Sequence, residues 1–331
     1  MRKQKYNIGI LGSTGAVGRE MIGILYSRRF AVGEIRAFSS DRSAGTEIPF
    51  GRDTVISRTV TDGAFDGLDI VLGAASSDVA RRYADEIVGS GAVFIDNSSA
   101  FRARDDVPLI IPEINADDIK VHHGIISNPN CSTAITLTAV APLHMISPIV
   151  SMTVTTFQAV SGAGVAGIDQ LENELSGNEV NRPAFPYRIA HNVIPCIGSV
   201  LPDGYTDEEM KMQYEGRKIL HASSLTVSCT CVRVPVVRCH SVSVCVRTER
   251  PITADEAYSA IAAAHGCITA NDTANGIYPM PLTAHERDSV YVGRIRRDLT
   301  DYNALDLFIC GDQLRKGAAL NAVQIAEILT K

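Results

Sequence analysis

The chain has 331 residues, more than one domain usually contains, and 45% of them are hydrophobic, so two domains with sizeable cores are expected. Its 31 basic and 37 acidic residues give a net charge of −6, which argues against a nucleic-acid partner. No stretch approaches the roughly 20 apolar residues of a membrane span, and the basic start lacks the apolar core of a signal peptide. A cytoplasmic protein with no membrane partner is therefore expected, in which the eight cysteines are reduced thiols.

The first predicted elements are a strand at residues 7–11 and a helix with apolar positions at Met21, Ile22 and Leu25. The turn between them reads Gly12-Ser13-Thr14-Gly15-Ala16-Val17-Gly18. A strand, a glycine turn and a helix in that order are the context of a dinucleotide-binding fingerprint, in which backbone N–H groups hold a pyrophosphate. The glycine spacing is GxxGxxG and not GxGxxG, and a plain tight turn is the alternative, but both flanks favour a nucleotide site.

The second predicted strand, residues 34–38, leads into Ser39-Ser40-Asp41-Arg42-Ser43-Ala44-Gly45. NAD-preferring proteins usually carry an acidic residue at this strand end, where it binds the ribose 2′-hydroxyl. The hydroxyl groups and the Arg42 guanidinium suit a 2′-phosphate instead, which favours NADP. Asp41 opposes this prediction, because a carboxylate in the same turn repels that phosphate unless it points away.

Strands at residues 69–75 and 92–96, with a helix at 80–88 between them, continue the pattern of buried parallel strands. The second of these strands leads to Arg102. Ligands bind beyond the carboxyl ends of parallel strands, so Arg102 is placed to hold an anion; a solvated surface arginine is the alternative.

The central candidate is Cys131, which follows Pro129 and precedes the apolar segment 134–143. Pro129 cannot continue a helix from inside, and the pattern after Cys131 predicts a helix start. The Cys131 sulfur then lies at the positive end of a helix dipole, where the nucleophilic thiolate form is favoured. Most cysteines are small core residues, so this prediction needs a base and an electrophile elsewhere in the chain.

After Cys131, the pattern predicts a strand at 151–158, then a small-residue turn at 159–164 that lets a backbone approach a ligand closely. Residues 178–204, rich in Pro and Asn, are expected to form a long excursion over a site or a subunit contact. A helix at 207–220 places Glu208 and Lys211 on one face, which alone is typical of a surface ion pair.

The strand-rich region 225–246 alternates Cys229, Cys231 and Arg233 onto one face. The spacing of these cysteines relative to Cys239 and His240 does not match the usual zinc sites, so no metal is expected. His240 is either a structural residue or the base of a nearby reactive cysteine. The C-terminal residues return to helical periodicity.

These motifs resemble those of the bacterial aspartate-β-semialdehyde dehydrogenases, and the resemblance covers the whole chain. In chain order they are GSTGAVG at 12–18, SSDRSAG at 39–45, DNSSAFR at 96–102, SNPNCST at 127–133, FQAVSGAG at 157–164, EEMKM at 208–212, RVPV at 233–236, CHS at 239–241 and DQLRKGAALNAVQIAE at 312–327. One such motif is weak evidence, whereas nine in the right order are specific.

The resemblance implies an α/β fold with a Rossmann-type dinucleotide-binding domain plus an α+β catalytic and dimerisation domain. The first domain spans residues 1–130 and is completed by a C-terminal helix at 313–331, and the second spans residues 131–312. A homodimer that binds NADP and small-molecule substrates is expected.

The resemblance also implies roles for individual residues. Cys131 matches the nucleophile, His240 the acid/base, and Gln158 the residue that orients the substrate and the acyl intermediate. The positions that bind the substrate carboxylate, its amino group and its phosphate are, in that order, Arg233, Glu208, and the pair Arg102 and Lys211. The cofactor-contacting positions are Gly12, Thr14, Gly15, Ala16, Val17, Arg42, Ser43, Ser161, Gly162 and Gln313.

The implied reaction is the reversible, NADPH-dependent reductive dephosphorylation of L-4-aspartyl phosphate to L-aspartate 4-semialdehyde through a Cys131 thioester. It serves the biosynthesis of lysine and diaminopimelate, threonine, methionine and isoleucine. A reductase of N-acetylglutamyl phosphate is the nearest alternative, but an acetylated amine has no charge for Glu208 to meet. A non-catalytic NADP-binding protein is a second alternative. In that case, the presence of a nucleophile, a base and anion-binding residues in one chain would be a coincidence.

One position differs from some members of the family, which carry Gly or Ala directly before the catalytic histidine. This chain has Cys239 there. Either the turn does not need a positive φ or its geometry differs, and a second thiol beside His240 is a candidate for oxidation.

Overall fold

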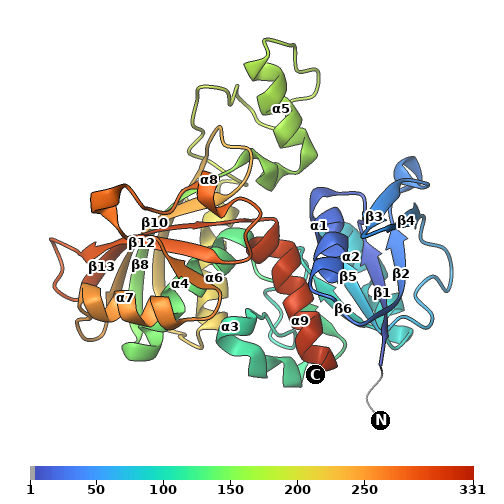
Figure 1. Ribbon diagram of the computed structural model, residues 1–331, viewed down its shortest axis with the longest axis horizontal. Coiled ribbons are helices and arrows are strands. Elements are labelled where there is room, and N and C mark those ends of the chain that lie inside the picture. Colours follow the sequence, from blue (N-terminus) through green and yellow to red (C-terminus); the bar gives the residue numbers. More distant parts are fainter. Residues whose placement is uncertain (1–3) are drawn as a thin grey trace. The chain divides into compact units, whose positions relative to one another are not determined.

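The computed structural model describes residues 4–331, which form two compact units (Figure 1). The first unit contains the described residues up to Asn130 together with Ala318–Lys331, and the second contains Cys131–Gly317. Within residues 4–331, no helix has both the length and the apolar character that a membrane crossing requires.

The first unit is built on a seven-stranded sheet with the order β3-β4-β2-β1-β5-β6-β7. Its strands are β1 (Tyr6–Leu11), β2 (Val32–Phe38), β3 (Glu47–Phe50), β4 (Asp53–Arg58), β5 (Ile70–Gly73), β6 (Val93–Asp96) and β7 (Ile125–Ser127). Strand β3 pairs antiparallel with β4, and the other neighbours pair in parallel. The predicted parallel α/β fold is confirmed.

Both faces of this sheet are covered by helices, because successive strand residues point to opposite sides. Helices α1 (Ala16–Ser27) and α9 (Leu320–Thr330) share one apolar cluster with Ile8 and Ile10 of β1. Helix α2 (Ser77–Gly89) packs on the other face with Phe94. The remaining helical segments are η1 (Asp41–Ser43), α3 (Pro112–Asn115) and η2 (Ala116–Val121).

The turn between β1 and α1 depends on close backbone packing at Gly18. A Cβ atom there would lie 2.3 Å from the Gly12 carbonyl oxygen and 2.7 Å from Ser13 Cα. We expect Gly18→Ala to lower the free energy of unfolding by about 1–3 kcal/mol, because backbone atoms have to move. Gly23→Ala, in the same helix but with nothing within 4 Å of the added atom, should raise it by about 0.5–1 kcal/mol. Urea denaturation measures both; equal shifts would contradict this explanation.

The second unit contains a six-stranded mixed sheet with the order β11-β12-β13-β10-β8-β9. Its strands are β8 (Ile149–Gln158), β9 (Thr226–Arg233), β10 (His240–Thr248), β11 (Cys267–Thr269), β12 (Val290–Arg297) and β13 (Ala304–Gly311). Helices α4 (Cys131–Ile146), α6 (Asp207–Ile219) and α7 (Ala254–Ala263) pack together against it (Figure 1). The remaining helical segments of this unit are η3 (Val160–Ala163), α5 (Val165–Leu175), η4 (Thr273–Asn275), α8 (Pro281–Ala284) and the π-helical turn η5 (Arg315–Ala319).

The segment that returns to the first unit begins at Ala318, later than the residue 313 that the resemblance implies. The side chains before it are bonded within the second unit. The Asp312 carboxylate accepts a hydrogen bond from Arg238 Nε at 2.7 Å, and Gln313 Oε1 accepts one from the Cys239 N–H at 2.7 Å. Residues 312–317 therefore stay with the second unit.

The long excursion at residues 178–204 is anchored beside β9. Ile194 exchanges two backbone hydrogen bonds with Arg233, of 2.9 and 2.8 Å. Phe185 and Ile194 also pack with Leu171 of α5 in a small apolar cluster. This segment therefore has a defined path next to Arg233, even though it lacks periodic structure.

Candidate active site

Helix α4 begins at Cys131, as predicted, and the residues of its first turns are buried. The half-buried Cys131 sulfur therefore lies at the positive end of the helix dipole, which favours the thiolate. The π-helical turn η5 approaches this cysteine closely, since a Cβ atom on Gly317 would lie only 3.0 Å from Cys131 Cβ. Glycine at 317 thus keeps side-chain bulk away from the candidate nucleophile.

His240 opens strand β10 and is completely buried. The Ala159 N–H donates a 3.0 Å hydrogen bond to its Nδ1 atom, so the neutral ring carries its proton on Nε2. The Nε2 atom has no hydrogen-bond partner among residues 4–331. Burial, followed by the charge of Arg233, lowers the pKa of His240 from 6.5 to about 3. His240 is therefore a neutral group with one unused N–H.

Arg233 ends strand β9 and is 6% exposed. Its guanidinium donates a 2.7 Å hydrogen bond to the Ala159 carbonyl and lies 5.5 Å from the Phe185 ring centroid. Burial lowers the pKa of Arg233, and the nearby Cys131 and Glu208 oppose this shift. Arg233 is thus a buried cation, and its charge acts on both Cys131, the candidate nucleophile, and His240, the candidate base.

The turn after β8 lies against these two side chains at Gly162. A Cβ atom there would lie 2.7 Å from a guanidinium nitrogen of Arg233 and 3.2 Å from His240 Cε1. Only glycine leaves Arg233 and His240 in their observed positions. The small-residue turn predicted from the sequence therefore does bring the backbone close to the site.

Gln158 joins Arg233 to helix α6. It pairs with Arg233 in the parallel β8–β9 ladder, and its Nε2 donates to Glu208 Oε1 at 3.2 Å. Lys211 Nζ donates to Glu208 Oε2 at 2.8 Å. The Glu208 side chain is only 11% exposed, so the expected helix pair is linked to the site and is not a solvated surface pair.

Arg102 lies in the first unit, whereas Lys211 lies in the second. Arg102 follows β6 and donates hydrogen bonds to the Asn97 carbonyl at 2.6 Å and to the Asn128 carbonyl at 2.9 Å. These bonds hold Arg102 at the carboxyl ends of β6 and β7, where the sequence analysis predicted an anion-binding residue.

The glycine turn of the first unit fits a pyrophosphate. Helix α1 starts after Gly15, and no described side chain caps it, so its first N–H groups are available to an anion. Gly12 has φ +91°, which a residue with a side chain rarely adopts, and a Cβ atom on Gly15 would have no neighbour closer than 3.5 Å. Thr14 belongs to the same turn, and Ala16 and Val17 are the first two residues of α1.

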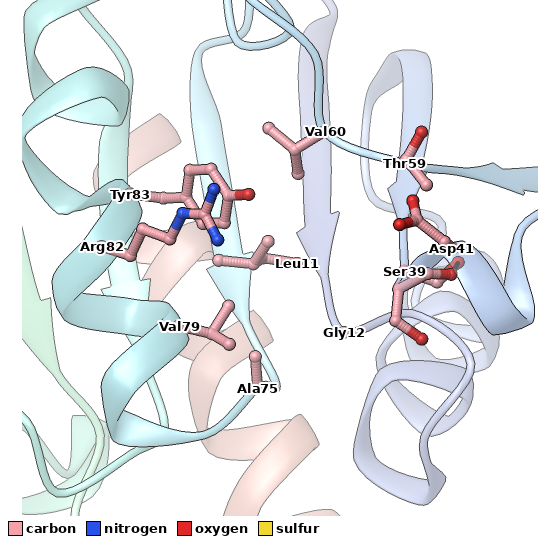
Figure 2. A pocket seen from close by; sticks show the side chains of 11 residues that line it. Leu11, Gly12, Ser39, Asp41, Thr59, Val60, Ala75, Val79, Arg82 and Tyr83 are labelled. Atoms are coloured by element: carbon pink, nitrogen blue, oxygen red, sulfur yellow. Dashed lines mark hydrogen bonds between the residues drawn. The ribbon is translucent and has the colours of Figure 1, made fainter.

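A pocket opens next to this turn (Figure 2). It is lined by Leu11, Gly12, Ser39, Ser40, Asp41, Thr59, Val60, Ala75, Val79, Arg82 and Tyr83. Figure 2 shows Arg82 and Tyr83 on the α2 side and Ser39 and Asp41 on the opposite side. No sequence motif points to Arg82 or Tyr83, because helix α2 carries no recognisable nucleotide-binding pattern.

The turn after β2 places Asp41 and not Arg42 in this pocket. Arg42 is exposed and Ser43 is partly buried on the same short helix η1, and neither is among the described lining residues. The Asp41 carboxylate therefore faces the pocket, which is the arrangement that opposes a 2′-phosphate.

Ser161 and Gln313, predicted to contact the cofactor, are bonded to each other within the second unit. Gln313 also accepts the Cys239 N–H, and Ser161 Oγ donates to the Val237 carbonyl at 2.5 Å. Cys239 has φ +78°, so the turn before His240 does adopt the conformation that favours glycine. Hydrogen bonds from these two side chains hold that strained turn.

Within residues 4–331, the cysteines of β9 are not brought together with Cys239 and His240 as a group of potential metal ligands. Among residues 4–331, one group of potential metal ligands lies close together, Cys245, Asp298 and Asp306. Asp298 Oδ1 already accepts hydrogen bonds from the N–H and Oγ1 of Thr300, both at 2.6 Å. We therefore interpret this group as part of a hydrogen-bonded turn and not as a metal site.

Comparisons with family models agree with this two-unit arrangement. Residues 7–122 match the model described as semialdehyde dehydrogenase, NAD binding domain, and residues 140–316 match that described as semialdehyde dehydrogenase, dimerisation domain. An aspartate-semialdehyde dehydrogenase from Synechocystis sp. is 43% identical over 328 residues, which cover 98% of this chain and 97% of the relative.

Solved structures show the same fold. The aspartate semialdehyde dehydrogenase II of Vibrio cholerae, complexed with ASA, has a TM-score of 0.95 and 38% identity, covering 99% of this chain and 98% of that one. The aspartate semialdehyde dehydrogenase of Candida albicans, solved with NADP, has a TM-score of 0.77 and 25% identity, covering 98% of each chain.

Proposed function

The chain belongs to the aspartate-semialdehyde dehydrogenase family, and we therefore propose that it interconverts L-4-aspartyl phosphate and L-aspartate 4-semialdehyde, with NADPH as the reductant. The observation that supports this best is the environment of Arg233. This buried cation interacts electrostatically with Cys131, His240 and Glu208. The product would supply the biosynthesis of lysine, diaminopimelate, threonine, methionine and isoleucine.

In the oxidative direction, the Cys131 thiolate adds to the aldehyde carbon and forms a thiohemiacetal. The nicotinamide cofactor, when bound, supplies the hydride acceptor for this reaction or, in reverse, the hydride donor. The resulting Cys131 thioester is attacked by phosphate, and the thiolate leaves as the acyl phosphate forms. The residues at the N-terminus of α4 stabilise that leaving thiolate through the helix dipole.

His240 can hold the proton during these steps. Its low pKa in the free protein has two causes, burial and the charge of Arg233. A substrate carboxylate bound to Arg233 cancels the second cause and raises the pKa of His240. Because the neutral ring already carries its proton on Nε2 and its Nδ1 accepts the Ala159 N–H, His240 acts through the Nε2–H, which donates a hydrogen bond to the oxygen of the Cys131 adduct as the thiolate adds.

The charged groups of aspartyl phosphate each find a partner in this proposal. Arg233 binds the carboxylate as a fork, and Glu208 meets the ammonium group. Lys211 and Arg102 bind the phosphate. Gln158, already bonded to Glu208, orients the substrate and the acyl group. An N-acetylated substrate has no cation for Glu208, which makes N-acetylglutamyl phosphate the weaker candidate.

The proposed cofactor is NADP. The N-terminus of α1 and the space at Gly15 support a bound pyrophosphate, and Ser39 lies in the adjoining pocket. Arg42 is the proposed partner of the 2′-phosphate, but it has to turn toward the pocket, where Asp41 opposes it. We propose a homodimer formed through the second unit, whose residues match a dimerisation domain.

The test is the reduction of NADP+ and of NAD+ by L-aspartate semialdehyde, with and without phosphate, followed by the absorbance of the reduced nicotinamide. We expect turnover that requires phosphate, because thioester cleavage needs it, and a higher kcat/KM with NADP+ than with NAD+. Arg42→Ala should lower this preference about tenfold, the effect of losing one charged hydrogen bond. Asp41→Asn is the matched control and should increase it.

Three other results would contradict the proposed substrate, the proposed activity or the proposed cofactor contact. Turnover of N-acetylglutamate semialdehyde in place of aspartate semialdehyde would replace the proposed substrate. Turnover of neither aldehyde would reject the proposed activity and favour the non-catalytic alternative. An unchanged cofactor preference in both variants would move the 2′-phosphate contact away from η1, with Arg82 as the next cation of the pocket.

A further inference from the structure

Glu209 lies in the EEMKM motif, but the resemblance gives it no role; both of its carboxylate oxygens accept hydrogen bonds. Oε2 accepts the Thr206 N–H at 2.8 Å, and Thr206 Oγ1 accepts the Glu209 N–H at 3.2 Å, so the two residues form a capping box at the start of α6. Oε1 accepts the Cys231 N–H of β9 at 2.9 Å. Glu209 is only 8% exposed. The Glu209 side chain therefore caps the N-terminus of α6 and also binds strand β9.

The Cys231 N–H lies on the unpaired edge of β9, since β9 is the last strand of its sheet and pairs with β8 on its other side. Alternate residues of a strand present their N–H groups to the same edge. On this edge the Arg233 N–H is taken by the Ile194 carbonyl at 2.8 Å, and the Val227 N–H by Gln213 Oε1 at 3.0 Å. The edge is thus occupied by hydrogen-bond acceptors and not by another strand.

Helix α6 contributes a polar stripe to this edge. Glu209, Gln213 and Arg217 are spaced four residues apart and so share one helix face. Glu209 accepts from Cys231, Gln213 accepts from Val227, and Arg217 Nε donates to the Leu225 carbonyl at 2.7 Å. These bonds set the position of α6 along β9.

Glu209 lies at the end of this stripe that carries the proposed substrate-binding groups. It directly follows Glu208 on α6, and its partner Cys231 lies two residues before Arg233 on β9. We propose that Glu209 is a positioning residue that sets the distance between the Glu208 carboxylate and the Arg233 guanidinium. It thereby determines how well the site selects an aldehyde that carries both an ammonium and a carboxylate group. This inference depends on the proposed function.

The test compares L-aspartate semialdehyde with succinate semialdehyde, which lacks the amino group that Glu208 is proposed to meet. Glu209→Gln keeps one acceptor oxygen and replaces the other by an NH2 group, so the side chain can accept only one of the Thr206 and Cys231 N–H groups. We expect KM for aspartate semialdehyde to rise about tenfold, kcat to change less than about threefold, and the ratio of kcat/KM for the two aldehydes to fall about tenfold. Glu209→Asp, which is shorter by one methylene, should show the same loss in smaller measure.

The matched control is Glu256→Gln. Glu256 forms a capping box of the same pattern at an exposed position on α7, accepting the Thr253 N–H at 2.8 Å, while Thr253 Oγ1 accepts the Glu256 N–H at 3.2 Å. This box carries no bond to β9 among the described residues. We expect Glu256→Gln to lower the melting temperature without changing the ratio of the two aldehydes.

A purely structural cap predicts an unchanged ratio in both variants, whatever the melting shifts, and that result would overturn the inference. No turnover of aspartate semialdehyde by the wild-type protein would reject the proposed function and the inference with it. Wild-type turnover with an unchanged ratio in both Glu209→Gln and Glu209→Asp would reject the inference alone.

Discussion

Cys131→Ala is expected to lower kcat for the phosphate-dependent oxidation of aspartate semialdehyde by about 10⁴-fold or more, because without the sulfur no thioester forms. The helix N-terminus and the proximity of Arg233 favour the thiolate of Cys131. Incubating the wild-type protein with the aldehyde and oxidised cofactor, but no phosphate, should therefore leave one acyl group on Cys131. Mass spectrometry of the intact protein and of its peptides measures this adduct.

Cys245 supplies the control for thiol chemistry. Burial and the neighbouring Asp306 and Asp298 carboxylates raise the pKa of Cys245 to about 12, so it remains a thiol at neutral pH. We expect iodoacetamide to alkylate Cys131 much faster than Cys245, and Cys245→Ala to retain activity. An acyl group found on another cysteine, or equal alkylation rates, would contradict the role of Cys131.

Arg233→Leu is expected to lower kcat/KM for aspartate semialdehyde by about 10³-fold, because the substrate carboxylate loses two charge-assisted hydrogen bonds. It should also raise the pKa of His240, since the Arg233 charge is one cause of its depression. The wild-type imidazole stays neutral as pH falls until about 3, whereas in the variant it should become protonated at a higher pH. Burial remains, so its pKa should stay below 6.5.

Arg233→Lys separates the two effects. Lysine keeps the positive charge but lacks the planar fork, so kcat/KM should still fall, by about 10²-fold, while the pKa of His240 stays low. NMR titration of the His240 ring, assigned with His240→Asn, measures the pKa in both variants. Identical titration in the Leu and Lys variants would show that the Arg233 charge does not lower the pKa of His240.

Local signals explain what was predictable from the sequence. The strand, glycine turn and helix from β1 through α1 depend on residues that are neighbours in the chain, and so does the helix start at Cys131 after Pro129. The alternation of Cys229, Cys231 and Arg233 in β9 likewise follows from the pleat of a single strand. By contrast, strands β12 and β13 and helix α7 lie in a region for which the sequence analysis made no prediction.

The candidate site itself required the tertiary structure. Sheet pairing places Gln158 of β8 beside Arg233 of β9, and the register of that pairing depends on which strand faces are buried. The same holds for the turn after β2, where sequence order alone does not decide whether Asp41 or Arg42 faces the pocket.

Glu209 shows most clearly which contacts can be predicted from the sequence and which depend on the tertiary structure. The capping-box pattern from Thr206 to Glu209 is visible in the sequence, because both partners lie in one helical turn. The bond from Cys231 to the other carboxylate oxygen is not visible, because it depends on β9 having an unpaired edge and on α6 lying along that edge. The sequence by itself thus determined the family, and it predicted the candidate nucleophile and the helix that carries Glu208 and Lys211. Packing decided the distances between those residues, because contacts between distant segments depend on the whole core.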